Sequence, residues 1–203
     1  MIRIAVLVSG GGTNLQALID NCKSGFIQGK IVLVISSRPQ AYALKRAEKE
    51  NIHTKVIEKK HYGNEKEYSD AIQREIRAKK VDLICLAGFL VKLSPNIIKT
   101  YESRIMNIHP ALLPSFGGKG MYGIKVHEEV LKRGQKYSGC SVHLVDEEYD
   151  HGPVILQKKV PVKKDDTPQI LAERILKEEH KLYPQAVRMF ALGKIKQISK
   201  RKS

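Results

Sequence analysis

Residues 2–14 read IRIAVLVSGGGTN, an apolar run that ends in a glycine turn and two polar residues. The uninterrupted apolar residues at 2–8 are typical of a strand buried on both faces of a parallel sheet. Apolar residues then recur at helical spacing over 14–23, which predicts a helix directly after the turn. A strand, a glycine turn and a helix in this order indicate an open α/β sheet that binds its ligand at the carboxyl ends of the strands.

The same alternation continues along the chain. It predicts strands at 31–36, 54–57, 81–87 and 104–108, and helices at 40–50, 64–79 and 95–101. The second half predicts a long loop at 110–123, a helix at 124–132, strands at 139–146 and 153–161, and a helix from Thr167 to about residue 192, bent or interrupted near Pro184 and ended by Gly193. We therefore expect an open, mostly parallel twisted sheet with helices on both faces and a Rossmann-like first half.

Length and composition predict one globular unit. The chain has 203 residues, of which 42% are hydrophobic and 28% charged, as in an average soluble domain. We expect a single domain over 1–193 and a basic tail over 194–203. No apolar run approaches the ~20 residues that span a bilayer, and the apolar start is too short for a signal peptide. Three widely spaced cysteines fit reduced thiols in the cytoplasm.

The charge balance is strongly basic. The sequence has 36 Lys and Arg against 21 Asp and Glu, a formal net charge of +15. Such an excess favours an anionic partner, and a basic nucleic-acid-binding module on an α/β scaffold is one alternative. However, most of the basic residues are lysines without the interleaved aromatic residues that stack on bases. A lysine-rich solvated surface explains the same composition.

The glycine turn has the composition of an anion-binding site. Residues 10–12 are glycines, whose backbone amides can turn toward a ligand at the positive end of the following helix. Thr13 and Asn14 add polar side chains. The turn does not match the G-x-G-x-x-G motif of dinucleotide-binding proteins, because Leu15 stands at the position of the third glycine. It does not match a P-loop either, because no lysine follows Gly12. A phosphate monoester is therefore the expected anion, with a capped tight turn as the alternative.

Asn107 and His109 stand at the end of the strand predicted at 104–108, where strand alternation places them on the same side. An asparagine amide can donate a hydrogen bond to a developing oxyanion, and a histidine beside it can transfer a proton near neutral pH. Asp150 lies in the turn DHGP at 150–153, where an aspartate is either a turn former or a partner for His109. The histidine spacing matches no metal motif, so we expect no metal.

Longer stretches of the sequence resemble the glycinamide ribonucleotide formyltransferase family, the folate-dependent formyltransferases of purine synthesis. The matching segments are VSGGGTNLQALI at 8–19, LAGFLVKLSP at 86–95, NIHPALLPSFGGKGMYG at 107–123, GCSVHLVDEEYDHGPVILQ at 139–157 and EHKLYP at 179–184. NIHPALLP followed by the D-x-G-P turn is a specific pair. The resemblance covers nearly the whole chain.

The resemblance implies the function and the residues that carry it. The amine of glycinamide ribonucleotide attacks the formyl carbon of 10-formyltetrahydrofolate, which is a co-substrate, and no metal takes part. The implied catalytic residues are Asn107, His109 and Asp150, with His143, Pro110 and Pro114 in support and a cis peptide between Leu113 and Pro114. The implied ribonucleotide residues are Gly12, Thr13, Asn14 and Glu179, and the implied folate residues are Phe89, Leu90, Val91, Lys92, Leu93, Ile105 and Asn107.

Two positions depart from the family pattern. A basic residue usually stands two places after Phe89, where this chain has Val91 and places Lys92 one residue later. Because neighbouring strand residues face opposite ways, Lys92 need not replace the missing group, which is expected to bind the glutamate tail of the folate. Leu176 stands where many relatives have a polar or basic group near the phosphate.

The resemblance also bears on partners and on competing functions. It implies small-molecule substrates, no membrane or nucleic-acid partner, and a cytoplasmic monomer or homodimer. Formyl transfer to methionyl-tRNA is the nearest alternative and would use the basic charge, but that family adds a C-terminal domain. A formyltetrahydrofolate hydrolase is disfavoured because the first strand begins at residue 2.

Overall fold

The computed structural model describes residues 1–195 and contains one seven-stranded sheet. The strands are β1 (Ile2–Val8), β2 (Gly29–Ser36), β3 (Thr54–Val56), β4 (Leu83–Leu86), β5 (Ile105–His109), β6 (Tyr137–Leu144) and β7 (Val154–Pro161). Their order across the sheet is β3-β2-β1-β4-β5-β6-β7. The pairs from β3 to β5 are parallel, and β6 and β7 are added in antiparallel pairs. The expected open, mostly parallel sheet is confirmed.

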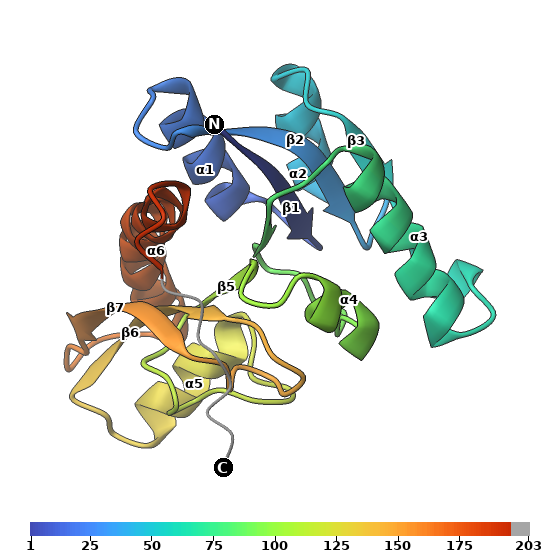
Figure 1. The fold of residues 1–203 in the computed structure, drawn as a ribbon. Helices are drawn as coiled ribbons and strands as arrows, with labels where there is room; N and C mark the ends of the chain where they lie inside the picture. Colours follow the sequence, from blue (N-terminus) through green and yellow to red (C-terminus); the bar gives the residue numbers. More distant parts are fainter. Residues whose placement is uncertain (196–203) are drawn as a thin grey trace, which may run out of the picture.

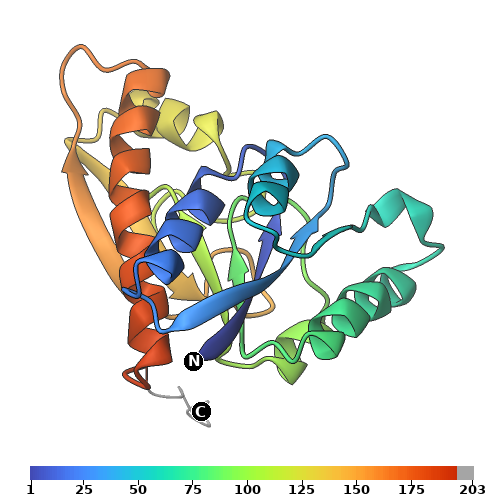
Figure 2. The same ribbon diagram turned by 90° about the horizontal axis from the view of Figure 1, so that it is seen from above.

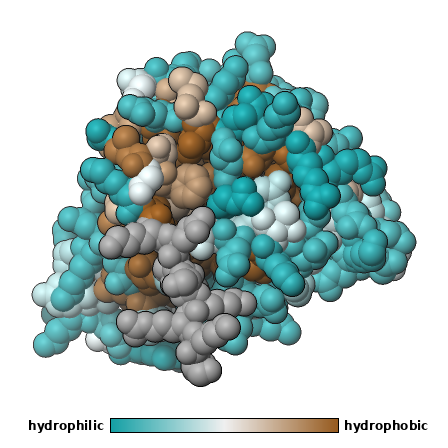
Figure 3. All heavy atoms as spheres, in the orientation of Figure 1, coloured by the Kyte–Doolittle hydropathy of each residue, from teal (hydrophilic) through white to brown (hydrophobic). Residues whose placement is uncertain are grey.

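Helices cover both faces of the sheet (Figures 1 and 2). One face carries α1 (Thr13–Lys23), α2 (Tyr42–Lys49), α5 (Ile124–Lys132) and α6 (Pro168–Ala191), and the other carries α3 (Glu65–Ala78) and α4 (Pro95–Thr100), with a short 3-10 turn, η1 (Lys59–His61), before α3. The outer face of α3, at the right in Figure 3, is hydrophilic, as an amphipathic helix requires.

Strand β1 shows why its sequence lacks polar alternation. Ile4, Val6 and Val8 belong to the core under α1 and α6, whereas Ala5 and Leu7 belong to the core under α3 and α4. Each of these side chains is fully buried. Because neighbouring strand residues face opposite sides, a central strand covered on both faces must be apolar throughout.

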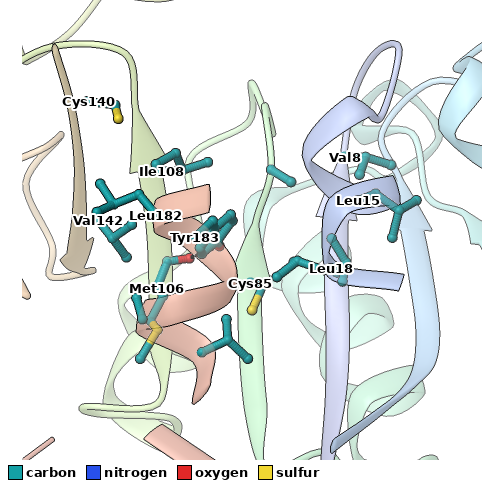
Figure 4. Packing of buried hydrophobic residues seen from close by; sticks show 14 of the residues in the cluster. Val8, Leu15, Leu18, Cys85, Met106, Ile108, Cys140, Val142, Leu182 and Tyr183 are labelled. Atoms are coloured by element: carbon teal, nitrogen blue, oxygen red, sulfur yellow. Dashed lines mark hydrogen bonds between the residues drawn. The ribbon is translucent and has the colours of Figure 1, made fainter. Parts of the chain in front are cut away.

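Tyr183 of α6 joins the helix layer to the neighbouring strands β4 and β5. Its ring is fully buried, and its hydroxyl lies 3.0 Å from the carbonyl oxygens of both Leu86 in β4 and Met106 in β5. The ring stands in the core beside Cys85, Met106 and Ile108 (Figure 4). The one proton of this buried hydroxyl is shared between the carbonyls of adjacent strands, immediately before Asn107, which holds the end of β5 where the candidate site begins.

Helix α6 departs from one expectation. The helix is continuous from Pro168 to Ala191, although Pro184 lies inside it, so of the two expected effects of Pro184 the interruption is wrong, and the bend stays a prediction. A proline inside a helix costs about 3 kcal/mol. The neighbours Leu182, Tyr183 and Val187 are buried, and burial of each large apolar side chain gains roughly 1.5–3 kcal/mol. Packing against the sheet therefore outweighs the missing hydrogen bond.

The ends of the helices follow their capping residues. The side chain of Thr167 accepts a hydrogen bond from the amide of Ile170 at the start of α6, and Ser94 does the same for Ile97 at the start of α4. After α6, Gly193 adopts a φ of 67°, so the expected end signal is confirmed. Of the expected tail over 194–203, residues 196–203 lie outside the described residues. No helix within 1–195 is both long and apolar enough to cross a membrane.

Candidate active site

A cavity of about 540 Å³ opens at the carboxyl ends of β1, β4 and β5. Its wall includes Asn14 after β1, Phe89 after β4, Asn107 and His109 in β5, and Asp150 in the turn after β6. These residues come from four separate segments of the chain. The parallel strands β1, β4 and β5 end at this edge, which brings Asn14, Phe89, Asn107 and His109 together. Strand β6 is antiparallel to β5, so Asp150 reaches the same edge through the turn that leads back from β6 to β7.

Asp150 lies between the other two members of the predicted trio. Its Oδ1 accepts a hydrogen bond of 3.3 Å from Asn107 Nδ2, and its Oδ2 lies 3.5 Å from His109 Nδ1. The backbone amide of Gly118 donates to the same Oδ2 at 3.1 Å. The His109 side chain is 4% exposed and that of Asp150 12%. The structure therefore brings together Asn107, His109 and Asp150, which the sequence could not join.

The tautomer of His109 follows from its other partner. Nε2 lies 2.8 Å from the carbonyl oxygen of Phe116, which can only accept, so Nε2 carries a proton. In the neutral ring, Nδ1 then presents a lone pair toward the carboxylate of Asp150. Two acceptors facing each other across 3.5 Å form a place that binds one proton, or one N–H or O–H donor from a substrate or water.

His143 fixes the orientation of the Asn107 amide. His143 Nδ1 lies 2.8 Å from the carbonyl oxygen of Leu144 and must donate to it, which leaves Nε2 as an acceptor. Nε2 lies 3.0 Å from Asn107 Nδ2. The amide nitrogen therefore faces His143 and Asp150, and the amide oxygen faces away from them. His143 is 2% exposed and contacts Asn107, and its implied supporting role stays a prediction.

Burial and neighbouring charges act in opposite directions on the two ionisable groups. For Asp150, burial raises the pKa, but the neighbouring His143 and His109 rings and the hydrogen bond from the Gly118 amide outweigh it and hold the pKa below its usual value. For His109, burial lowers the pKa and outweighs the raising effect of Asp150. At neutral pH the site therefore holds a carboxylate and a neutral imidazole.

The turn that carries Asp150 depends on its glycines. Asp150 has a φ of 53°, a left-handed conformation that aspartate and asparagine tolerate better than most residues. Gly152 is required by space, because a Cβ there would lie 1.9 Å from the carbonyl oxygen of Leu144. A Cβ on Gly117 would meet the side chains of Leu113 and Asp150. The glycine of the D-x-G-P turn therefore allows the close backbone packing that places the Asp150 carboxylate beside His109.

The glycine turn after β1 has its carbonyl groups directed away from a ligand. The carbonyl of Gly10 accepts from the amide of Ala43 at 3.1 Å, that of Gly11 from Arg46 Nε at 2.8 Å, and that of Gly12 from the amide of Gln16 at 3.0 Å. The backbone amides of residues 10–14 have no hydrogen-bond partner among the described residues. Free amides at the start of α1 form the kind of nest that binds an anion.

Gly12 is the glycine of this turn that cannot be replaced without strain. It has a φ of 72°, and a Cβ there would lie 2.6 Å from the Cβ of Ala43. We expect Gly12→Ala to lower the free energy of unfolding by about 2 kcal/mol or more. Gly10→Ala is the matched control, because a Cβ at Gly10 meets nothing within 4 Å. Denaturant unfolding measures both, and equal losses in the two variants would contradict this account of the turn.

Glu179 and Asn14 meet across 165 residues of sequence. Asn14 Nδ2 donates to Glu179 Oε2 at 2.7 Å, and Glu179 is 7% exposed. Burial raises the pKa of Glu179, although the bond from Asn14 opposes this. Asn14 Oδ1 is buried without a partner. Both residues line the large cavity, whereas Gly12 and Thr13 stand outside its wall.

The predicted folate residues surround a smaller pocket beside the first. Phe89, Val91, Lys92 and Leu93 line this space of about 90 Å³ together with Asn107, and Leu90 lines the large cavity. Ile105 lines neither space, because its side chain is 1% exposed in the core under α3 and α4. Lys92 extends over the ring of Tyr149, with Nζ 5.4 Å from the ring centre.

The supporting prolines occupy different places. Pro110 lines the large cavity, whereas Pro114 stands outside both spaces and follows a cis peptide bond from Leu113, as the resemblance implied. Sequence reasoning missed Tyr149, which lines both spaces, and the carbonyl of Phe116, which carries no signal because every residue has a carbonyl. His127 also lines the large cavity, and burial lowers its pKa to about 4.

Comparison with known proteins agrees with the fold. The family model described as formyl transferase matches residues 2–187. Together with the trio at the carboxyl edge of an open sheet, this match defines an α/β enzyme of the formyl transferase class. The chain belongs to the formyl transferase family and, within it, to the phosphoribosylglycinamide formyltransferases.

Individual relatives support this membership. The phosphoribosylglycinamide formyltransferase of Haemophilus influenzae is 39% identical over 97% of this chain and 90% of its own length. The crystal structure of glycinamide ribonucleotide transformylase 1 from Symbiobacterium toebii has a TM-score of 0.93 and 42% identity, over 99% of this chain and 92% of that one. The trifunctional purine biosynthetic protein adenosine-3 of Gallus gallus is 43% identical, but this chain spans only 19% of its length.

Proposed function

We propose that this protein transfers the formyl group of 10-formyltetrahydrofolate to the amine of glycinamide ribonucleotide, a step of purine biosynthesis. The observation that carries the proposal is the position of Asp150. It contacts both Asn107 and His109 at a cavity that lies between a free-amide nest and an apolar pocket. The names of the full-length relatives support the same substrates.

The ribonucleotide fits the half of the cavity near α1 and α6. The free amides of residues 10–14 would hold its phosphate at the positive end of α1. The partnerless Oδ1 of Asn14 and the carboxylate of Glu179 are acceptors suited to the hydroxyl groups of a ribose. The amine of the ribonucleotide would then extend toward His109 and Asp150.

The folate fits the other half. Phe89, Val91, Leu93 and Ile98 give the smaller pocket apolar walls for a flat ring system, and Asn107 stands where the two spaces meet. Lys92 is the cation at this pocket and would face the acidic tail of the folate. Its position over Tyr149 differs from the family pattern, in which the basic residue stands at position 91.

Formyl transfer requires a hydrogen-bond donor for the formyl oxygen and a proton acceptor for the attacking amine. As the amine attacks the formyl carbon, a C–N bond forms and charge develops on the formyl oxygen. Asn107 Nδ2 would donate to that oxygen in place of its long bond of 3.3 Å to Asp150. The attacking nitrogen becomes acidic, and its proton would pass to His109 Nδ1 and Asp150 Oδ2, directly or through water. The proton then reaches the folate nitrogen as its bond to the formyl carbon breaks.

Further features belong to the same proposal. We propose that residues 1–193 act as a single domain and that the protein works in the cytoplasm on small molecules, without a metal, as a monomer or homodimer. Asn107, His109 and Asp150 act on the reacting atoms, while Gly12, Thr13, Asn14 and Glu179 bind the ribonucleotide. Formyl transfer to methionyl-tRNA has less support, because the full-length relatives carry the name phosphoribosylglycinamide formyltransferase.

A spectrophotometric assay tests this proposal. The folate absorbance is followed with 10-formyltetrahydrofolate alone, with added glycinamide ribonucleotide, and with added methionyl-tRNA. We expect folate turnover only in the tube with the ribonucleotide. Turnover without any acceptor would indicate a hydrolase, and turnover with the tRNA alone would replace the proposed acceptor.

A further inference from the structure

Arg46 of α2 lies behind the glycine turn and contacts it directly. Its Nε donates to the carbonyl oxygen of Gly11 at 2.8 Å, and its Nη1 lies 3.4 Å from Oε1 of Gln16 in α1. The guanidinium also stacks on the ring of Tyr42, 5.1 Å from the ring centre. These contacts with three different segments hold a long side chain in one position. A planar guanidinium suits such a set because its donors are fixed relative to one another.

The bond to Gly11 determines where the next amide points. In a planar trans peptide the carbonyl and the following N–H point in opposite directions. With the Gly11 carbonyl held by Arg46, the amide of Gly12 must face away from α2. Ala43 acts on the preceding peptide in the same way, because its backbone amide donates to the Gly10 carbonyl at 3.1 Å. Helix α2 therefore sets the orientation of the nest from behind.

Arg46 also supplies a charge that the cavity wall lacks. Among the described residues, no lysine or arginine lines the large cavity, whereas Asp150, Glu173 and Glu179 do. Leu176, which lines the cavity from α6, carries no charge. The influence of Arg46 reaches α6, since the pKa of His180 is lowered by burial and, after that, by the charge of Arg46. The guanidinium thus stands behind the amides that would meet a phosphate.

We propose that Arg46 is a positioning residue of the phosphate subsite, which orients the Gly11–Gly12 peptide and places a positive charge behind the nest. The inference rests on the proposed function, because it assumes a phosphorylated substrate in this half of the cavity. It assigns to α2 the cationic contribution that the cavity wall does not supply.

The test compares Arg46→Ala with Lys45→Ala. Lys45 is an exact charge match on the same helix and lies over the same Tyr42 ring, 5.9 Å from its centre, but makes no hydrogen bond to the glycine turn. Because Arg46→Ala removes a charged donor that orients the Gly11–Gly12 peptide, we expect it to raise KM for the ribonucleotide by about tenfold or more. The KM for the folate and kcat should stay within about twofold, and Lys45→Ala should behave as the wild type.

Arg46→Lys separates the effect of the positive charge from the effect on the orientation of the Gly11–Gly12 peptide. It keeps the positive charge but loses the planar donor beside Gly11, so we expect a KM between those of the wild type and Arg46→Ala. Equal KM values in Arg46→Ala and Lys45→Ala would overturn the inference. So would a parallel rise of both substrate KM values with a lower Tm, because that pattern indicates a general structural role.

A binding measurement keeps this inference separate from the proposed function. Ribose 5-phosphate is titrated calorimetrically into the wild type, Arg46→Ala and Lys45→Ala. Weaker binding only in Arg46→Ala supports the role of Arg46 even if the wild type transfers no formyl group. Wild-type formyl transfer with equal ribose 5-phosphate binding in all three proteins would reject Arg46 and leave the proposed function standing.

Discussion

Asp150→Asn is expected to lower kcat by about a thousandfold, within the 10²–10⁴ range of general acid–base groups. The substitution replaces the carboxylate of Asp150, whose Oδ2 lies 3.5 Å from His109 Nδ1, with an uncharged amide of nearly the same shape. The attacking amine then has no anionic group to receive its proton. Asparagine is chosen because it tolerates the φ of 53° at this position, so the turn should keep its conformation. Steady-state kinetics measure the loss.

The acid side of the pH profile supplies a second readout for Asp150→Asn. Neutral His109 is the active form, so wild-type kcat/KM should fall as the pH drops below 6.5 and through the lowered pKa of His109. Burial lowers that pKa, and Asp150 partly restores it. Without the carboxylate, the pKa should fall further, and the acid limb of the residual activity should move to lower pH. A kcat within tenfold of the wild type would contradict a role for Asp150 in the chemistry.

His109→Ala is expected to reduce kcat between a hundredfold and ten-thousandfold while leaving a folded protein. The variant loses the ring whose Nε2 donates to the Phe116 carbonyl at 2.8 Å and whose Nδ1 faces Asp150. It therefore removes a proton acceptor and one contact that holds the loop over the cavity. Kinetics with both substrates saturating measure the effect on kcat, and circular dichroism checks the fold.

His151→Ala is the matched control for His109→Ala. His151 directly follows Asp150, but its side chain is 67% exposed and pairs with Asp146 at 2.8 Å. It lines neither space at the site. We expect its kcat to stay within about twofold of the wild type. If His109→Ala retained full activity, or if His151→Ala lost as much, the assigned mechanism would be wrong.

Local sequence patterns predicted most of the fold. The unbroken apolar run of β1 indicated burial on both faces, and Ala5 and Val6 indeed enter opposite cores. Ser94 and Thr167 marked the starts of α4 and α6 because they cap the following amides. Pro184 does not interrupt α6, because the burial of Tyr183 beside it lies outside what a local sequence rule can take into account. The helices and strands could be predicted where the local sequence preference and the packing against the sheet favour the same structure.

The candidate site could be predicted only as separate segments. Strand alternation placed Asn107 and His109 together, but 43 residues separate Asn107 from Asp150, and only the family resemblance joined them. Backbone partners such as the Phe116 carbonyl leave no trace in the sequence. Ile105 was assigned to the folate through the resemblance, yet its side chain points into the core, because on β5 it faces the α3 and α4 side.

A single-turnover transfer of labelled formyl carbon tests the central claim most directly. Enzyme in excess is mixed with 10-formyltetrahydrofolate labelled at the formyl carbon and with glycinamide ribonucleotide, and the label is located by mass spectrometry. We predict that the wild type places the label on the amine of the ribonucleotide within one turnover, while Asp150→Asn binds both substrates and leaves the label on the folate. Label released as formate by the wild type, or transferred equally fast by Asp150→Asn, would contradict the account.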